Sequence, residues 1–154
     1  MFKVTGRKGE ELVNQYLDRL KSSGQILNHT WYNKSLEQGL PYDFHIQENN
    51  QNIVHLDVKS TSYKFEQPMI FSGQEIDFIT TTPNYSIYRV YNLSDTANHH
   101  LRICNNGKVF ATTLIPHIST FRTNLQALNV GLPSVKFAIA PTVGNLTFNG
   151  EINL

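Results

Sequence analysis

Apolar residues near the start of the chain repeat at helical spacing. Between residues 9 and 20 they fall at every third or fourth position, and a Ser-Ser-Gly run follows them. At about 100° per residue, Glu10 lies at the edge of the apolar side of this helix, whereas Glu11 lies on the polar side. The two adjacent glutamates are therefore predicted to have different environments. The apolar residues are Leu12, Val13, Tyr16, Leu17 and Leu20.

Shorter alternating patterns follow and predict strands at residues 26–32, 42–47 and 53–59. A loop with Gly39 and Pro41 separates the first two. The turn-rich segment 48–52 joins the last two, so we expect them to form a hairpin.

The second half of the chain contains a clear helix start. Ser72 and Glu75 have the spacing of a capping box after a short strand at 69–71, so a short helix is predicted there. Asn106-Gly107 is predicted to be a turn that leads into a strand. The other predicted elements are strands at 85–92, 101–104, 108–111, 135–140 and 146–149, and a helix within 117–129.

The length and composition fit one domain with a buried core. The chain has 154 residues, of which 40% are hydrophobic and 16% charged, as in ordinary globular proteins. No stretch approaches the roughly 18 apolar residues of a membrane span, and no apolar region of a secretory signal follows the first basic residues. We therefore expect a cytoplasmic protein without a membrane partner. The single cysteine, Cys104, excludes an intramolecular disulfide and is expected to be a core residue.

Two strand patterns bring acidic residues and a lysine together. Side chains alternate across a strand, so Asp57 and Lys59 share one face of the 53–59 strand. In the 42–47 strand, Asp43 and His45 are expected to lie opposite the apolar side chains, Tyr42 among them. If residues 47 and 53 pair, Asp43 lies directly opposite Asp57.

Two opposed carboxylates repel each other, which costs stability unless the site binds a cation. Mg²⁺, or Mn²⁺ in its place, commonly takes one or two carboxylates, waters and phosphate oxygens, as in phosphodiester hydrolysis. Lys59 is expected either to stabilise negative charge in the transition state or to position and deprotonate the attacking water. Glu10 is expected to add a metal ligand or to hold a metal-bound water.

Other polar residues are weaker candidates for substrate binding. Lys3, Arg7, Lys8 and Lys64 are expected either to form a basic rim or simply to aid solubility. Arg89 is a candidate for phosphate contact, although its strand pattern mainly reflects packing.

Further polar residues have two interpretations each. Ser60 and Thr61 follow the lysine and either orient water or phosphate or end the strand. His45 and His55 are either a cross-strand metal pair or, more commonly, a polar sheet face or groove lining. Glu75 is expected to cap Ser72 rather than to bind metal.

The order of these residues resembles the PD-(D/E)xK nuclease superfamily, here as Gly9-Glu10, Pro41-Tyr42-Asp43 and Asp57-Val58-Lys59. More narrowly, the chain resembles the NO VEIN C-terminal type domain, an uncharacterised, Mrr-like branch of that superfamily. The resemblance covers residues 6–105 and leaves 106–154 outside. The segments that carry it are 6–13, 39–43, 57–61, Phe71-Ser72 with Glu75, and 85–90.

The resemblance implies an α/β (α+β) fold, with a restriction-endonuclease-like mixed central sheet flanked by helices, and a site at Glu10, Asp43, Asp57 and Lys59. It also implies a DNA endonuclease of a prokaryotic defence or restriction system, with a helicase or ATPase as domain or partner. The chain departs mildly from the family pattern at two positions. Tyr42 separates Pro41 from Asp43, and this branch often has Glu in place of Asp57, although both acids keep the ligand chemistry. Residues 106–154 are expected to form a strand-rich extension packed on the same domain.

The formal net charge of +1 limits the functional interpretation. Proteins that hold nucleic acid alone through many phosphate contacts are usually more basic, so a partner is expected to present the substrate. A homodimer is a further expectation, because nucleases that cut both strands often act as dimers. The alternative is a catalytically inactive nuclease-fold module that binds nucleic acid or a protein.

Overall fold

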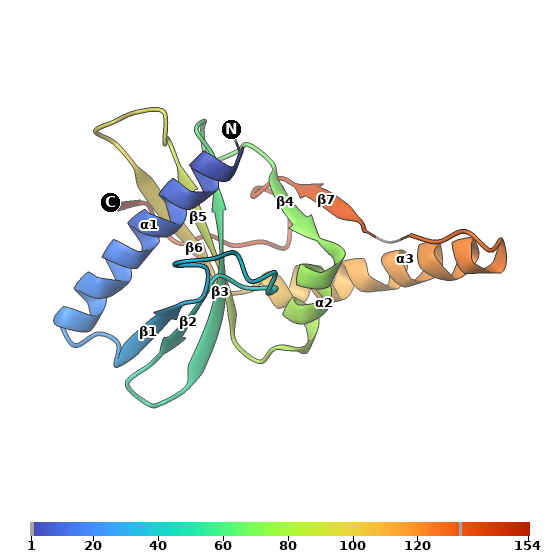
Figure 1. Cartoon of the computed structure of the whole chain (residues 1–154), viewed down its shortest axis with the longest axis horizontal. Coiled ribbons are helices and arrows are strands. Elements are labelled where there is room, and N and C mark those ends of the chain that lie inside the picture. Colours follow the sequence, from blue (N-terminus) through green and yellow to red (C-terminus); the bar gives the residue numbers. More distant parts are fainter. Residues whose placement is uncertain (1, 133) are drawn as a thin grey trace.

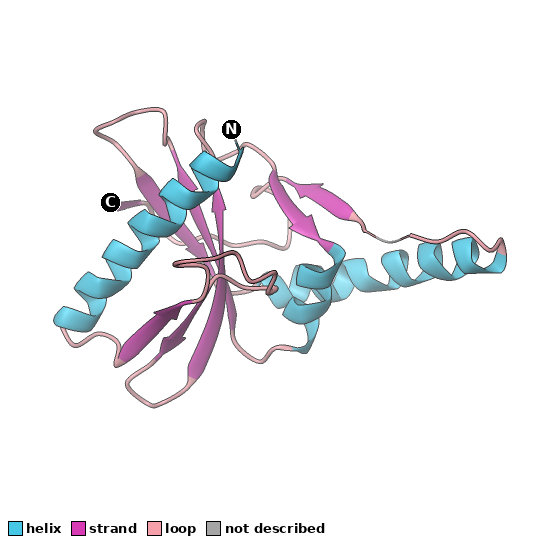
Figure 2. Cartoon of the chain, in the orientation of Figure 1, coloured by secondary structure: helices cyan, strands magenta, loops and turns pink. Residues whose placement is uncertain are grey.

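A six-stranded mixed sheet forms the centre of the computed structural model, and helices flank it (Figures 1 and 2). The structure describes residues 2–132 and 134–154, of which residues 2 and 3 are described for the backbone alone. The predicted fold class, a mixed central sheet flanked by helices, is confirmed. The helices are α1 (Phe2–Ser22), α2 (Gly73–Thr81) and α3 (Gly107–Ala127); the strands are β1 (Asn28–Trp31), β2 (Phe44–Gln47), β3 (Ile53–Ser60), β4 (Met69–Ser72), β5 (Tyr85–Tyr91), β6 (His100–Cys104), β7 (Lys136–Ile139) and β8 (Ile152–Asn153).

The strand order of the large sheet is β1-β2-β3-β5-β6-β8, and β4 pairs with β7 in a separate small sheet. Strands β3 and β5 are parallel, and the other pairs are antiparallel. Gln47 pairs with Ile53 and His45 with His55, which confirms the predicted hairpin register. The start of β2 therefore lies beside the middle of β3.

Each face of the sheet has its own hydrophobic core. On one face, α1 packs Leu12, Val13 and Leu17 against Phe44 and Leu56. On the other face, the core is built by residues of α2, α3, β4 and β7 against β5 and β6. This second cluster consists of Met69, Phe71, Ile76, Ile79, Tyr85, Ile87, Cys104, Ala111, Ile118 and Ile139. The side of β3 that carries Asp57 and Lys59 is thus covered and not open to water.

Helix α1 begins at Phe2, earlier than the predicted start at residue 9. The sequence did not reveal this start because no apolar residues recur at helical spacing between residues 5 and 8, and Val4 is 73% exposed. Gly9 lies in close contact with Ser60 and Val58 of β3. A Cβ atom there would lie 1.7 Å from Ser60 Oγ, so only glycine fits without a shift.

The prediction for residues 106–111 is wrong. Instead of a turn and a strand, helix α3 begins at Gly107 and runs for 21 residues. Gly107 packs against Ile87, where a Cβ would lie 3.2 Å from the Ile87 Cδ1 atom. The glycine thus serves close packing of the helix on β5, and the Asn-Gly pair does not form a hairpin turn.

Two further predictions need correction. Residues 146–149 form no strand and contribute only an isolated bridge between Phe148 and Cys104, while the short strand β8 lies further along. Tyr42 precedes β2, so strand alternation does not apply to it, and its ring packs on His55 and Phe78. Among the described residues, no helix is long and apolar enough to cross a membrane.

Candidate functional site

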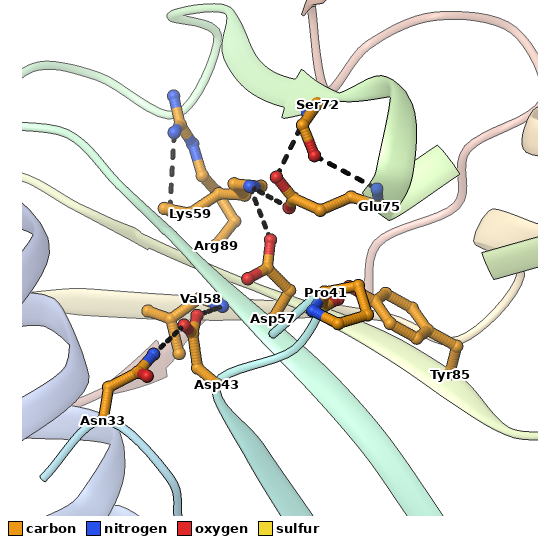
Figure 3. Close-up of polar contacts among 10 residues, drawn as sticks. All are labelled: Asn33, Pro41, Asp43, Asp57, Val58, Lys59, Ser72, Glu75, Tyr85 and Arg89. Carbon is orange, nitrogen blue, oxygen red and sulfur yellow. Dashed lines mark hydrogen bonds and ion pairs between the residues drawn. The ribbon is translucent and has the colours of Figure 1, made fainter. Parts of the chain in front are cut away.

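Asp43 lies directly before β2, where the hairpin meets the loop that follows β1. Its Oδ2 accepts a hydrogen bond from the Val58 backbone N–H at 2.8 Å, and its Oδ1 accepts one from Asn33 Nδ2 at 2.9 Å. The Asn33 side chain is itself buried. These two bonds hold the carboxylate against β3, beside Asp57 (Figure 3).

Asp57, Lys59 and Glu75 point toward one another in the space between β3 and α2 (Figure 3). Lys59 Nζ lies 2.5 Å from Asp57 Oδ2 and 2.6 Å from Glu75 Oε2. The ammonium group also lies 4.5 Å from the centre of the Phe71 ring, a cation–π contact. All three charged side chains are less than one fifth exposed, so their charges interact more strongly than they would in water.

Burial dominates the acidity of this cluster. It raises the pKa of Asp57 to about 7, with Lys59 opposing the rise and Asp43 adding to it. Burial, together with the charge of Asp57, also raises the pKa of Glu75 to about 7. Burial alone lowers the pKa of Lys59, but the two carboxylates outweigh it and raise that pKa above its usual value. At neutral pH the lysine is therefore a cation.

Glu10 lies on the α1 side of the same region. Its Oε1 accepts a hydrogen bond from the Trp31 indole N–H at 3.0 Å. Burial raises the pKa of Glu10, and the charges of Glu37 and, less strongly, Asp57 add to the rise. Burial also raises the pKa of Asp43, and the charge of Glu10 adds to that rise. As predicted, Glu11 is different, because its side chain is 46% exposed and pairs with Arg7.

The basic residues expected at the rim are arranged in different ways. Arg7 is bound to the neighbouring loop, since its guanidinium donates to the carbonyls of Asn33 and Lys34 and stacks on Trp31 at 4.4 Å. Lys8 and Lys64 are exposed. The Lys3 side chain lies outside the described residues.

Arg89 does not face the carboxylate cluster with free donors. It is 1% exposed, and its guanidinium donates to the backbone carbonyls of Lys59, Phe65 and Gln67. Burial lowers its pKa to about 10, which still leaves it charged at neutral pH. Arg89 therefore holds the loop after β3 in place through these hydrogen bonds. The expected phosphate contact has no support in this geometry.

Ser60 and Thr61 lie away from the lysine. Ser60 faces α1 at the contact with Gly9, and its buried Oγ has no hydrogen-bond partner. Thr61 continues the strand pairing through its N–H to the Val90 carbonyl. Neither hydroxyl is brought to Asp57 and Lys59.

His45 and His55 are paired across the hairpin. Their ring centroids are 6.3 Å apart and the rings are nearly perpendicular. Both nitrogens of His45 already contact hydroxyls, Nδ1 with Tyr32 and Nε2 with Thr30. The two histidines belong to a half-buried aromatic face of the hairpin beside the site.

Sequence reasoning missed Glu75 as a member of the cluster. Its predicted role is confirmed, because Ser72 and Glu75 form a complete capping box at the start of α2. The same carboxylate uses its second oxygen for Lys59. The place of Glu75 among the segments that resemble the family was the one indication of a role in the site. Local spacing does not predict the small sheet of β4 and β7, or that α2 lies close to β3.

The donor chemistry of the site fits a hard divalent cation. Among the residues whose placement is described, no three acidic, histidine or cysteine side chains are arranged to hold a metal ion. Mg²⁺ does not need three, since one or two carboxylates with waters suffice. Asp43 and Asp57 supply such a pair. The buried Oδ2 atom of Asp57 forms an ion pair with Lys59 but accepts no hydrogen bond from the described residues.

Fold and cluster together define a mixed α+β domain with a buried carboxylate–lysine site at the junction of a hairpin and two helices. The chain belongs to the family described as Protein NO VEIN, C-terminal, whose model matches residues 9–103. The matched segment contains Glu10, Asp43, Asp57, Lys59 and Glu75. No curated protein and no solved structure matches the chain.

Proposed function

We propose that this domain is a metal-dependent endonuclease that hydrolyses phosphodiester bonds of DNA. The observation that carries the proposal is the convergence of Asp43, Asp57 and Lys59 at one point of the β2–β3 hairpin (Figure 3). Two carboxylates with an adjacent lysine are the groups that such chemistry requires. Their order along the chain resembles that of the PD-(D/E)xK nucleases.

Asp43 and Asp57 are the residues assigned to Mg²⁺ or Mn²⁺. A bound cation would supply Lewis acidity toward a phosphate oxygen and lower the pKa of a coordinated water. Asp43 is already oriented by the Val58 N–H and the Asn33 amide, so its carboxylate needs little reorganisation. Glu10 is assigned to holding a water on the α1 side of the site. The charge of Asp57 contributes to the raised pKa of Glu10.

Lys59 is assigned to charge stabilisation and not to proton abstraction. Its raised pKa keeps the ammonium protonated at neutral pH, so it is a poor base and a good partner for a developing negative charge. Because Lys59 lies beside Asp57, its charge would lie close to a phosphate bound through a metal ion at that carboxylate.

DNA is proposed as the substrate and a partner as the means of delivery. The formal net charge of +1 supports delivery, because it provides little general attraction for a polyanion. Domains of the type that this chain resembles occur fused to helicases and ATPases in prokaryotic defence systems. The proposal extends this setting to the present chain.

A non-catalytic binding module is the second candidate. The observation that favours it is the position of Lys59, whose ammonium lies between Asp57 and Glu75 and offsets part of their negative charge without a metal ion. In that case the cluster would serve the stability of the β3–α2 contact. The two candidates differ in whether the acids bind a divalent metal.

Calorimetric titration with Mn²⁺ and a cleavage assay with Mg²⁺ separate the two candidates. The nuclease proposal expects metal binding that is lost in Asp43→Ala, together with DNA cleavage that is lost in Asp57→Ala and Lys59→Ala. Absence of both metal binding and cleavage in the wild-type protein would support the binding module instead.

A further inference from the structure

A groove lies on the α1 face of the sheet, at the end where the β2–β3 hairpin turns and β5 begins. Its volume is about 350 Å³, and sites for small molecules commonly measure about 300–1,000 Å³. Leu20, in the last turn of α1, lies on one side of it, and Asn105, directly after β6, lies on another. Segments that are distant in the sequence therefore meet around one space of the right size for a small molecule.

The floor of this groove is formed by apolar side chains of four neighbouring strands. Ile46 pairs with Val54 across the hairpin, and Tyr88 pairs with Ile103 on the next two strands of the sheet. All four side chains pack with the α1 core and line the groove. Branched aliphatic side chains on a sheet suit contact with the flat face of a ring, whereas they leave the hydroxyls of a sugar without partners.

Tyr88 brings one polar group into this floor. The residue is 5% exposed, and its hydroxyl forms no hydrogen bond within the part of the chain that the structure describes. The hydroxyl oxygen is not sealed from solvent, unlike the unpartnered Oγ of Ser60, so it borders the open space of the groove. Buried tyrosine hydroxyls ordinarily have a partner, so this one is free to bond a molecule in the groove.

The Tyr88 hydroxyl is a donor at neutral pH. Burial raises the pKa of Tyr88, and the charges of Tyr16 and Glu48 add to the rise. The hydroxyl therefore keeps its proton.

Asparagine amides form the polar edge of the groove. Asn84, Asn105 and Asn149 all line it and are exposed. Ser86 Oγ donates to Asn105 Oδ1 at 2.6 Å, which orients that amide. An amide presents a donor and an acceptor side by side, which matches the N6 and N7 positions of adenine. Guanine presents two acceptors at that edge and is better matched by arginine or lysine.

The charge of the groove disfavours a phosphate. Among the described residues that line it, Glu48 carries the charge, and neither lysine nor arginine is present. A phosphate group would therefore find no cationic partner there and would be repelled by the carboxylate. The chemistry favours a ligand with a flat apolar body, a donor–acceptor edge and no negative charge.

We propose that this groove binds an uncharged adenine nucleoside, with the base on the aliphatic floor and its edge bonded to the asparagine amides and the Tyr88 hydroxyl. The groove lies on the opposite face of the sheet from Asp57 and Lys59, because Val54 and Ile46 pack with the α1 core. It is a second site and does not depend on the proposed nuclease activity.

Calorimetric titration of the full chain with adenosine tests this site. Adenosine is expected to bind, adenosine monophosphate to bind at least about tenfold more weakly, and ribose to give no heat. Tyr88→Phe is expected to weaken adenosine binding about tenfold, since one hydrogen bond is lost. It should leave thermal unfolding unchanged, because the hydroxyl has no partner among the described residues. The matched control is Tyr63→Phe, at a side chain that is 68% exposed in the loop after β3, and it should bind as the wild type does.

Methyl NMR places the bound nucleoside. Adenosine is expected to shift the methyl signals of Ile46 and Ile103 and to leave that of Ile70, which is 50% exposed on β4, unchanged. Absence of adenosine binding to the wild type would overturn the proposal. So would equal binding of the monophosphate, equal binding by Tyr88→Phe and wild type, or shifts confined to methyl groups outside the groove.

Discussion

Lys59 and Glu75 form a short, buried ion pair that joins strand β3 to helix α2, with Nζ and Oε2 2.6 Å apart. Glu75 also completes the capping box of α2 with Ser72. One carboxylate thus fixes both the start of a helix and the position of the lysine. The geometry of the site is therefore coupled to the stability of α2.

Two substitutions separate these roles of Glu75. Glu75→Gln keeps a side chain that suits a capping box but removes the charge beside Lys59, so DNA cleavage is expected to fall by about tenfold or more. Ser72→Ala removes the cap but leaves the ion pair, so it should lower the free energy of unfolding by about 1 kcal/mol and largely preserve cleavage. Urea denaturation and a cleavage time course measure both effects. Equal cleavage by Glu75→Gln and wild type would show that Lys59 needs no such support.

The raised pKa values of the buried carboxylates predict how stability depends on pH. In the folded protein Asp57 titrates at about 7, compared with an ordinary value of 3.8, so the folded state holds a proton that the unfolded state has lost over this range. Stability therefore falls as pH rises from about 4 to about 7, and Glu75 adds to the fall. Unfolding free energies of the metal-free protein at pH 5 and pH 8 measure this loss.

Asp57→Asn provides the control for this pH dependence. The neutral amide cannot ionise, so the variant is expected to lose less stability than the wild type between pH 5 and pH 8. Identical pH profiles for the two proteins would contradict the burial of an ionisable Asp57.

Gly9 is required by the close approach of α1 to β3. Gly9→Ala is expected to lower the free energy of unfolding by about 1–3 kcal/mol, because the new Cβ would lie 1.7 Å from Ser60 Oγ. Gly6 lies in the same helix, and a Cβ atom added there would meet nothing within 4 Å, so Gly6→Ala should stabilise the protein by up to about 1 kcal/mol. Thermal unfolding compares the two variants, and a neutral Gly9→Ala would argue against this packing.

Arg89 is predicted to stabilise the fold. Arg89→Met should cost about 2–4 kcal/mol of unfolding free energy, because the carbonyls of Lys59, Phe65 and Gln67 would lose the buried guanidinium that donates to them. Lys64→Ala, at an exposed side chain of the same loop, should change stability by less than about 0.5 kcal/mol. Chemical denaturation of both variants measures the difference. A stable Arg89→Met protein with impaired DNA binding would restore the phosphate-contact hypothesis.

The sequence predicted the hairpin at the heart of the site correctly. Strand alternation and a five-residue turn were enough to pair His45 with His55 and to place Asp43 beside Asp57. Helical phase was enough to distinguish Glu10 from Glu11. These predictions succeeded because they depend on local periodicity.

The parts that failed depend on contacts between distant segments. Asn106-Gly107 has the composition of a hairpin turn, but packing of Gly107 on Ile87 makes it the start of a helix. The approach of Glu75 to Lys59 results from the position of α2 over β3, which no local pattern reveals. Tertiary packing decided both cases.

Nicking of covalently closed circular DNA tests the central claim most directly, because a closed circle has no ends and reports only internal cleavage. Purified wild-type protein is compared with Asp57→Asn and with Lys21→Ala, whose side chain is exposed in the last turn of α1, in the presence of Mg²⁺ or Mn²⁺ and with a chelator. Wild type and Lys21→Ala are predicted to nick the circle only with metal, and Asp57→Asn to leave it closed. Metal-independent nicking, or equal nicking by Asp57→Asn, would contradict a metal-dependent nuclease site at Asp43, Asp57 and Lys59.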